Sequence, residues 1–320
     1  MQENAYIIWE YDQTIAEQIG NKAAKLGELR KIGIKIPAGF ILTKAAFLDF
    51  ITANGIYTKL NKLLTHLPFQ PEGIKKSSQR MSELFADSYI PTQIIDELAS
   101  AGNILSAKTF AVRSSSCIED LDQASFAGLY DTFHNVSPGN ELIEGVKRCW
   151  QSAFSLRALA YLKRLDLPIK DLKDLSMAVI IQQMINSRLA GVMFTVSPAT
   201  GDASKILIEY SAGLGDSVVS GEITPHSILI DKITNQVSRT GEQGSANLLE
   251  ERYIYQLIGL ARRIEEHFGS YQDIEWTIDS DSAEIIILQA RPETVWNKRP
   301  QVPFHKPGQT VFSFISEVKL

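Results

Sequence analysis

The stretch QDIEWTIDSDSAEIIILQARP, residues 272–292, decides how the second half of the chain folds. Polar and apolar residues alternate in its first part, which is typical of a strand with one covered face. By this alternation, one face of the strand carries Asp273, Glu275 and Thr277. Strict alternation in the second part puts on one face Ile285, Ile287, Gln289 and Arg291. We therefore expect two neighbouring strands whose polar residues line a cavity.

Three residues on these strands predict a site for a metal and a phosphate. Glu275 and Gln289 supply hard oxygen atoms, which suit Mg²⁺ because this ion usually binds few protein groups together with substrate phosphates. Arg291 supplies a fork of N–H donors for phosphate oxygens. The alternative is an edge-strand polar pair beside a surface arginine, and the strand pattern alone favours neither interpretation.

The segments around this stretch predict an α+β half with a mostly antiparallel sheet. Four runs rich in Ile and Val are strand-like and separated by turns, at residues 176–185, 190–197, 205–211 and 226–233. A helical pattern covers residues 250–269. The four prolines from Pro292 to Pro307 indicate a linker that leaves a domain.

The first half of the chain is predicted to be mostly helical. Apolar spacing and breaker residues predict helices over residues 21–34, 43–56 and 91–102. Short strands are expected over residues 36–43 and 110–115, and a polar loop with Pro and Gly over residues 67–78. Apolar residues at every fourth position predict one long core-packing helix over residues 140–166.

Composition and charge exclude several classes of protein. The 320 residues are 44% hydrophobic and 22% charged, which is ordinary for a soluble globular protein. The net charge of −5 argues against a general nucleic-acid binder. Two cysteines make no disulfide framework, the N-terminus does not resemble a signal peptide, and no apolar run is long enough to span a membrane. We expect a cytoplasmic protein with no nucleic-acid or membrane partner.

A run of hydroxyl residues around one cation predicts an anion site. Arg113 is followed by Ser114, Ser115 and Ser116, and we expect a loop whose hydroxyl and amide groups bind phosphate. The alternative is a serine-rich loop that caps a helix. Further along the chain, Gly128 would let the backbone approach a ligand closely.

Two other features are weaker signals. Lys22 lies just past Gly20 at the start of a predicted helix, where the helix dipole favours anions, but a lysine there is usually a solvated charge. The glycines of residues 208–225 fit a loop that approaches a ligand. The P-loop pattern GxxxxGK[ST] is absent from the sequence, and the five histidines show no metal-ligand spacing.

Taken in order, five segments resemble the N-terminal nucleotide-binding domain of the pyruvate phosphate dikinase and phosphoenolpyruvate synthase family. Rifampin phosphotransferase and the glucan, water dikinases share this domain. The segments are residues 20–43, 112–133, 191–202, 208–225 and 273–296. The resemblance covers roughly residues 4–297, and the ending QARPETVW is most similar to the phosphoenolpyruvate synthase branch.

This resemblance implies an ATP-grasp fold that holds ATP between two lobes, with Mg²⁺ as the metal. The residues that match ATP-contacting positions of the family are Lys22 and Arg113 at the phosphates, Gly128 and Thr132 in the loop over the triphosphate, Gln182 near the adenine, and Glu209 at the hinge. Those that match the Mg²⁺ ligands are Glu275 and Gln289, and Arg291 matches the cation on the terminal phosphates. Arg113 and Arg291 are therefore the expected catalytic cations.

In the family, a histidine on a separate swivelling domain takes phosphate from ATP and carries it to the acceptor's domain. This sequence has neither the TSH-like histidine motif nor the acceptor-binding barrel, so we expect the ATP half of such an enzyme. Its partner would be a phosphohistidine-carrying domain or protein. We expect an N-terminal lobe over residues 1–185, a second lobe over 186–297 and a tail over 298–320. The acceptor stays open among pyruvate, a glucan and an antibiotic.

The alternative function is a regulatory module that binds ATP and phosphorylates nothing. The full set of predicted ligands argues against it, because a sensor need not keep residues for the metal and the terminal phosphates. Both a stand-alone protein and a truncated one are compatible with the sequence.

Overall fold

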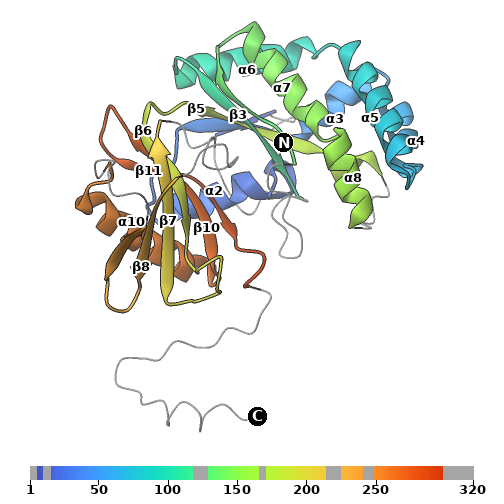
Figure 1. Cartoon of the computed structure of the whole chain (residues 1–320). Coiled ribbons are helices and arrows are strands. Elements are labelled where there is room, and N and C mark those ends of the chain that lie inside the picture. The colour runs from blue at the N-terminus through green and yellow to red at the C-terminus, as the bar shows by residue number, and fades with distance from the viewer. Residues whose placement is uncertain are drawn as a thin grey trace.

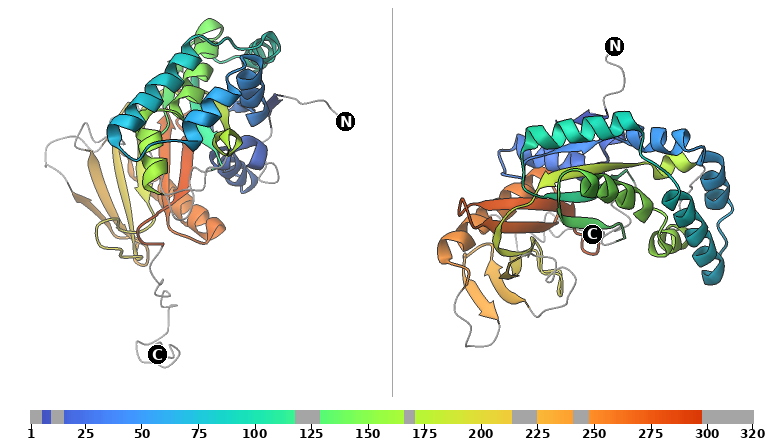
Figure 2. Two further views of the ribbon diagram at one scale, coloured as in Figure 1. Left: turned by 90° about the vertical axis from the view of Figure 1, so that its right-hand side faces the viewer. Right: turned by 90° about the horizontal axis from the view of Figure 1, so that it is seen from above.

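The computed structural model describes residues 6–9, 16–117, 129–165, 171–213, 225–240 and 248–297. Within these ranges the chain forms two antiparallel sheets, each covered by helices (Figure 1). Figure 2 shows the same arrangement from two further sides, with α10 at one end of the molecule and α4 and α5 at the other. The predicted α+β class is confirmed.

The first sheet has five strands, of which four belong to the first half of the chain and the central one, β5, to the second. Their order across the sheet is β1 (Ile7–Ile8), β2 (Gly39–Leu42), β5 (Met177–Gln183), β3 (Phe110–Ser116) and β4 (Thr132–Val136). All neighbours pair antiparallel. Every residue of β3 is buried because both faces of the sheet are covered.

The second sheet has six strands, all from the second half of the chain. Their order is β11 (Ile285–Pro292), β10 (Gln272–Asp279), β6 (Ser187–Phe194), β7 (Lys205–Ala212), β8 (His226–Asp231) and β9 (Val237–Thr240). Each neighbouring pair is antiparallel, as the sequence predicts for this half. The predicted strands of this half are confirmed, whereas the short strand β9 was not predicted, nor were β1 and β4 of the first sheet.

Helices of the first half cover one face of the first sheet. They are α3 (Lys44–Ala53), α4 (Tyr57–Thr65), α5 (Pro71–Ala86), α6 (Thr92–Leu105), α7 (Asn140–Ser152) and α8 (Leu156–Arg164), followed by the short η2 (Leu172–Leu175). Their core is aromatic, because the rings of Phe47, Phe50, Phe85, Trp150 and Phe154 pack against one another. The large apolar area buried in this core fixes the helices on the sheet.

A second core lies between the two sheets and under the second one. Helix α10 (Glu251–Phe268) covers the apolar face of β10 and β11. The N-terminal helices α1 (Ala16–Ile19) and α2 (Asn21–Lys31) join the same core, and α2 contacts both β3 and β11. The first helices of the chain therefore complete the core of its last sheet. The division at residues 185 and 186 stays a prediction.

Two expectations about the helical half were wrong. Residues 67–78 are not a loop, because α5 begins at Pro71. Proline is favoured in the first turn of a helix, and Ile74, Met81 and Phe85 form a buried stripe that the polar residues around them hide in the sequence. The single helix expected over residues 140–166 is two helices. The Ser155 hydroxyl accepts a hydrogen bond from the Ala158 amide at 3.2 Å, and α8 starts anew there.

Two expectations about strands were also wrong. Ser114, Ser115 and Ser116 lie in β3 and are buried, so they do not form the expected loop. A β-bulge interrupts the alternation in β11, because Gln289 pairs with Glu275 while Ile287 pairs with the next residue, Trp276. Ile285 and Ile287 therefore face the apolar core rather than the side that carries Gln289 and Arg291. Strict alternation cannot anticipate one extra residue.

Candidate functional site

One arginine of the first sheet reaches into the second sheet. The Nη2 atom of Arg113 donates to Oε1 of Gln289 at 2.7 Å and lies 3.5 Å from Oε2 of Glu275. Its Nη1 atom donates to the backbone carbonyl of Leu288 at 2.8 Å. The Arg113 side chain is 10% exposed, so the contact is largely shielded from water. The structure thus brings three of the predicted site residues together.

The bulge in β11 produces this geometry. Gln289 and Glu275 are direct cross-strand partners, so their side chains share one face of the sheet. Leu288 is the extra residue of the bulge, and its carbonyl accepts from Arg113. The local irregularity that sequence alternation misses is therefore part of the site.

The oxygens of Glu275 and Gln289 converge on one cation position. The Nη2 atom of Arg113 contacts both of them. We call the place of this atom the shared position, because a cation bound there would contact both oxygens. One carboxylate and one amide oxygen are hard ligands of the kind that Mg²⁺ takes when phosphates and water complete its shell. The two side chains therefore fit the predicted metal. No cluster of three or more His, Cys, Asp or Glu that could hold a metal occurs among the described residues.

The second predicted cation is held by an acid that sequence analysis did not assign a role. Nε of Arg291 lies 2.7 Å from Oδ2 of Asp273, and Nη2 lies 2.6 Å from the same oxygen. Arg291 and Asp273 are cross-strand partners two residues from the Glu275 pair, so all four side chains lie on one face. The sequence pattern could have indicated this role for Asp273, because the alternation puts Asp273 on the same face of the strand as Glu275.

The start of α2 is pressed against β3. Gly20 has a φ of 79°, and a Cβ atom there would lie 2.3 Å from the Ser115 carbonyl oxygen. The Ser115 hydroxyl accepts a hydrogen bond from the Ala23 amide at 3.1 Å and so caps the helix that glycine cannot cap. Lys22 is consequently buried, with Nζ 3.5 Å from the Ser114 hydroxyl. Lys22 is therefore not the solvated charge that such a lysine usually is.

The other predicted residues lie on the strands around this centre. Thr132 is the cross-strand partner of Arg113, and Gln182 shares its face of the first sheet. Gln182 is 1% exposed, and its Nε2 atom has no hydrogen-bond partner among the described residues. Glu209 lies in the same cross-strand row as Glu275, with Val192 between them. Gly128 lies outside the described residues.

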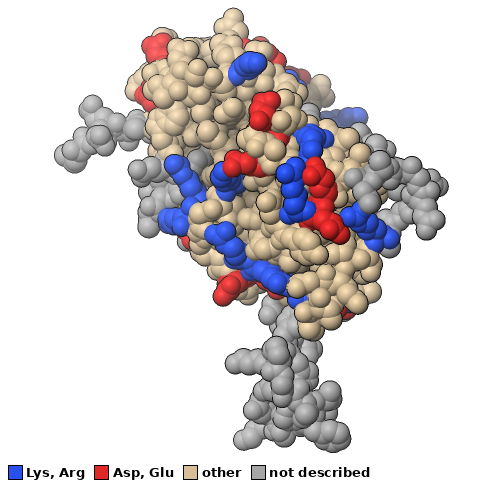
Figure 3. All heavy atoms as spheres, turned by 90° about the vertical axis from the view of Figure 1, so that its left-hand side faces the viewer, with Lys and Arg blue, Asp and Glu red and all other residues tan. Residues whose placement is uncertain are grey.

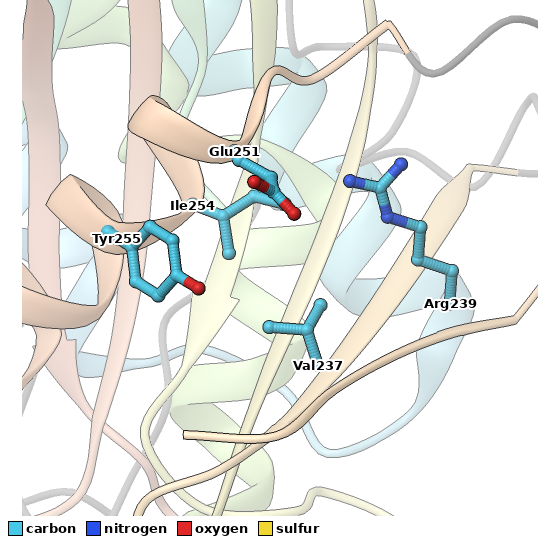
Figure 4. Close-up of a pocket in the computed structure, with 5 residues that line it drawn as sticks. All are labelled: Val237, Arg239, Glu251, Ile254 and Tyr255. Atoms are coloured by element: carbon cyan, nitrogen blue, oxygen red, sulfur yellow. The ribbon is translucent and has the colours of Figure 1, made fainter.

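A separate pocket lies elsewhere on the molecule. It has a volume of about 280 Å³ and lies between β9 and the start of α10 (Figure 4). It is lined by Val237, Arg239, Glu251, Ile254 and Tyr255. None of the residues that the sequence singles out lines it. Basic and acidic side chains are interspersed on the face that Figure 3 shows, and no described helix is long and apolar enough to cross a membrane.

Comparison with known sequences shows to which protein family the chain belongs. The sequence pattern described as "Pyruvate phosphate dikinase, AMP/ATP-binding domain" matches residues 16–246 and 231–310. The chain belongs to this family. The resemblance seen in the sequence is thereby confirmed, and with it an adenine nucleotide of the AMP/ATP type as the ligand class.

Curated relatives cover most of this chain but are longer. Phosphoenolpyruvate synthase of Aeropyrum pernix is 32% identical over 96% of this chain and 44% of its own length. Probable phosphoenolpyruvate synthase of Methanothermobacter thermautotrophicus is 34% identical over 86% of this chain and 44% of its length. Rifampicin phosphotransferase of a Streptomyces species is 34% identical over 87% of this chain and 34% of its length. The chain spans less than half the length of these relatives.

Solved structures of a synthetase and a ligase are distant matches. An ADP complex of N5-carboxyaminoimidazole ribonucleotide synthetase is 9% identical, with a TM-score of 0.38 over 88% of this chain and 46% of that one. The D-alanine-D-alanine ligase of Coxiella burnetii is 10% identical, with a TM-score of 0.33 over 87% of this chain and 48% of that one.

Proposed function

We propose that this chain binds Mg–ATP between its two sheets and forms the phosphate-donating part of an ATP-dependent phosphotransferase. The observation that carries the proposal is the contact of the Arg113 guanidinium with the side-chain oxygens of Glu275 and Gln289. A cation of the first sheet lies against one carboxylate oxygen and one amide oxygen of the second sheet, and such oxygens are suitable ligands for Mg²⁺. Phosphoryl transfer depends mostly on positioning and on stabilising charge, and this arrangement offers both.

The phosphate chain would lie along the cations of the site. Lys22, Arg113 and Arg291 are the proposed phosphate contacts, and Arg113 and Arg291 would stabilise the negative charge that develops during transfer. Asp273 holds the Arg291 guanidinium on the side of Glu275, so it would position that cation. Thr132, beside Arg113 in the ladder, and Gly128 would lie over the triphosphate.

The adenine would lie at the other end of the site. The buried Nε2 of Gln182 is a donor that needs an acceptor, and a ring nitrogen of adenine would supply one. Glu209 lies two strands from Glu275, about 10 Å away at the usual strand spacing. This separation suits an extended nucleotide with its base near Glu209 and its phosphates near Glu275.

Glu275 and Gln289 would hold the metal. Mg²⁺, when bound there, would supply positive charge that offsets the charge of the phosphates. The protein's share is to present one carboxylate and one amide oxygen from a rigid hairpin and to keep water out of the site.

The phosphate would pass to a histidine on a separate domain or chain, and from there to an acceptor bound elsewhere. The names of the relatives, phosphoenolpyruvate synthase and rifampicin phosphotransferase, support an ATP-dependent transfer and leave open whether the acceptor is pyruvate or another molecule. The sparse cysteines support a cytoplasmic location.

A thermal-shift titration with ATP, with and without Mg²⁺, tests the proposal. We expect ATP to raise the melting temperature, and Mg²⁺ to enlarge that rise, because a ligand that binds only the folded state stabilises it by mass action. The matched variant is Glu275→Gln, which should lose the Mg²⁺-dependent part and keep the rest. If ATP raises the melting temperature of the wild type equally with and without Mg²⁺, the result would instead support a regulatory ATP-binding module.

A further inference from the structure

The two arginines of the site come from different sheets and are held in different ways. Arg291 makes two short contacts to the Asp273 carboxylate, at 2.6 and 2.7 Å. The short contacts of Arg113 are to neutral groups, the Gln289 amide oxygen and the Leu288 carbonyl. Its carboxylate contact, to Glu275, is 3.5 Å long, whereas charge-assisted hydrogen bonds are usually about 2.7–2.9 Å. Arg113 is therefore the arginine that a stronger anion can draw away.

The guanidinium of Arg113 is also incompletely satisfied. Its Nε atom is buried and has no hydrogen-bond partner among the described residues. Buried N–H groups normally have partners, so this arrangement leaves a donor that phosphate oxygens could satisfy. Lys22, whose Nζ lies near the Ser114 hydroxyl next along β3, would attract the same anion. A phosphate chain on the β3 side thus gains a second cation if Arg113 turns toward it.

The position that Arg113 occupies is the position that a metal needs. Its Nη2 lies within reach of both Gln289 Oε1 and Glu275 Oε2. A magnesium ion would approach these oxygens to about 2.0–2.1 Å, which leaves no room for the guanidinium nitrogen. Two cations at such close range would also repel each other strongly in a shielded site.

We propose that Arg113 guards the metal-binding oxygens of Glu275 and Gln289 in the nucleotide-free protein. A divalent cation then binds this pair only together with a phosphate chain that draws Arg113 away. This inference rests on the proposed function and adds regulation of the same site: metal and nucleotide bind as one unit, and free metal binds poorly. The movement of Arg113 also breaks its link to the Leu288 carbonyl, so it alters a contact between the two sheets.

The test is a titration with Mn²⁺ alone, without nucleotide, followed by the electron paramagnetic resonance signal of the free ion. The wild type should bind Mn²⁺ weakly. Arg113→Gln, which removes the charge and vacates the shared position, should bind Mn²⁺ at least about tenfold more tightly. The double variant Arg113→Gln/Glu275→Gln should lose this gain. A wild type that binds Mn²⁺ as tightly as Arg113→Gln would overturn the inference.

The matched control is Arg291→Gln. It removes one positive charge close to the Glu275–Gln289 pair but leaves Nη2 of Arg113 in contact with both oxygens, so it should gain much less Mn²⁺ affinity. An equal gain in both variants would overturn the inference, because general charge rather than occupation would then decide binding.

Folding and the proposed function are checked separately. Circular dichroism melts report whether Arg113→Gln folds. If it does not, Arg113→Met keeps an unbranched side chain but removes the charge and all donors, and it should also bind Mn²⁺ more tightly than the wild type. No gain in that variant would count against the inference. If Mg–ATP does not raise the melting temperature of the wild type, the proposed function is rejected. If Mg–ATP raises it but the wild type binds Mn²⁺ tightly without nucleotide, only the guarding role of Arg113 is rejected.

Discussion

At the scale of single residues, Arg291 is the site cation whose loss should be best tolerated by the fold. Its side chain lies near the end of β11 and is partly exposed, and its ion pair with Asp273 is at the rim of the sheet. The two side chains are 19% and 13% exposed, so the loss of this pair should cost less stability than the loss of a fully buried pair. Its contact with a phosphate would be charge-assisted and partly shielded, so it should matter more for binding than for folding.

Arg291→Ala should therefore weaken ATP binding and leave the fold intact. Loss of one charge-assisted contact of about 1.5–3 kcal/mol lowers affinity roughly 10- to 150-fold. Calorimetric titration with Mg–ATP measures the change, and the melting temperature without ligand reports the fold. The control is Arg252→Ala, which removes an exposed arginine of α10 that is paired with Glu250. ATP affinity equal to that of the control would reject the assignment of Arg291.

Gly20 is a residue at which a single methyl group should disturb the site. Gly20→Ala places a Cβ 2.3 Å from the Ser115 carbonyl oxygen and keeps a φ of 79°. Gly55→Ala has a similar φ of 62° but meets no atom within 4 Å, so it carries the backbone strain alone. We expect Gly20→Ala to destabilise the chain by clearly more than the control, which should lose about 1 kcal/mol. Urea unfolding of both variants measures the difference, and equal losses would mean that α2 does not need its close approach to β3.

At the scale of elements, sequence patterns predicted most strands and helices because burial of one face imposes a period on the residues. The prediction failed where a local device broke that period. The bulge at Leu288 shifts two isoleucines to the opposite face, and the cap at Ser155 divides one expected helix into two. In α5, Pro71 and Gly73 suggested a loop, although proline suits a first turn and Gly73 packs against Pro68.

A hydrogen bond between α4 and the residue just before η2 should make the free energy of unfolding fall at high pH. The Tyr57 hydroxyl of α4 donates to Oδ1 of Asp171, just before η2, at 2.5 Å. This hydrogen bond, with burial and the Asp171 charge, raises the pKa of Tyr57 from 10.0 to about 12. The folded protein holds the proton more tightly than the unfolded chain. The stabilisation is therefore complete below pH 10 and is lost as the pH rises from 10 to about 12.

Tyr57→Phe should accordingly be less stable than the wild type at pH 8, by at most about 1 kcal/mol because the pair is partly solvated. The difference between the two proteins should shrink as the pH rises from 10 to about 12. Urea unfolding at pH 8, 10 and 11 measures it. Tyr89→Phe is the control, because Tyr89 is 64% exposed and its change should give no such trend. A constant difference across this range would mean that the hydroxyl of Tyr57 is not tied to Asp171 in solution.

At the scale of the whole molecule, the sequence identified the polar residues of the site but did not predict that those of the two sheets are in contact. The strand pattern found Glu275 and Gln289 as neighbours because they lie on one hairpin. The contact of Arg113 with Gln289 joins residues 176 positions apart, and local periodicity carries no information about such a distance. The same holds for α2, whose apolar stripe predicts a covered face but does not say which sheet covers it.

This long-range packing predicts that the second lobe cannot fold by itself. Its core includes Ile19, Leu26, Leu29 and Ile34, each at most 3% exposed. Burial of such side chains contributes about 1.5–3 kcal/mol each, or about 6–12 kcal/mol together, which is comparable to the whole net stability of a domain at about 5–15 kcal/mol. A fragment of residues 186–297 should therefore lack a cooperative melting transition, whereas residues 16–297 should melt cooperatively. Adding a peptide of residues 16–36 should partly restore the transition in the short fragment, as measured by calorimetry. A short fragment that melts cooperatively near the temperature of the long one would show that the division after residue 185 separates independent domains, and that α2 only rests on the second sheet.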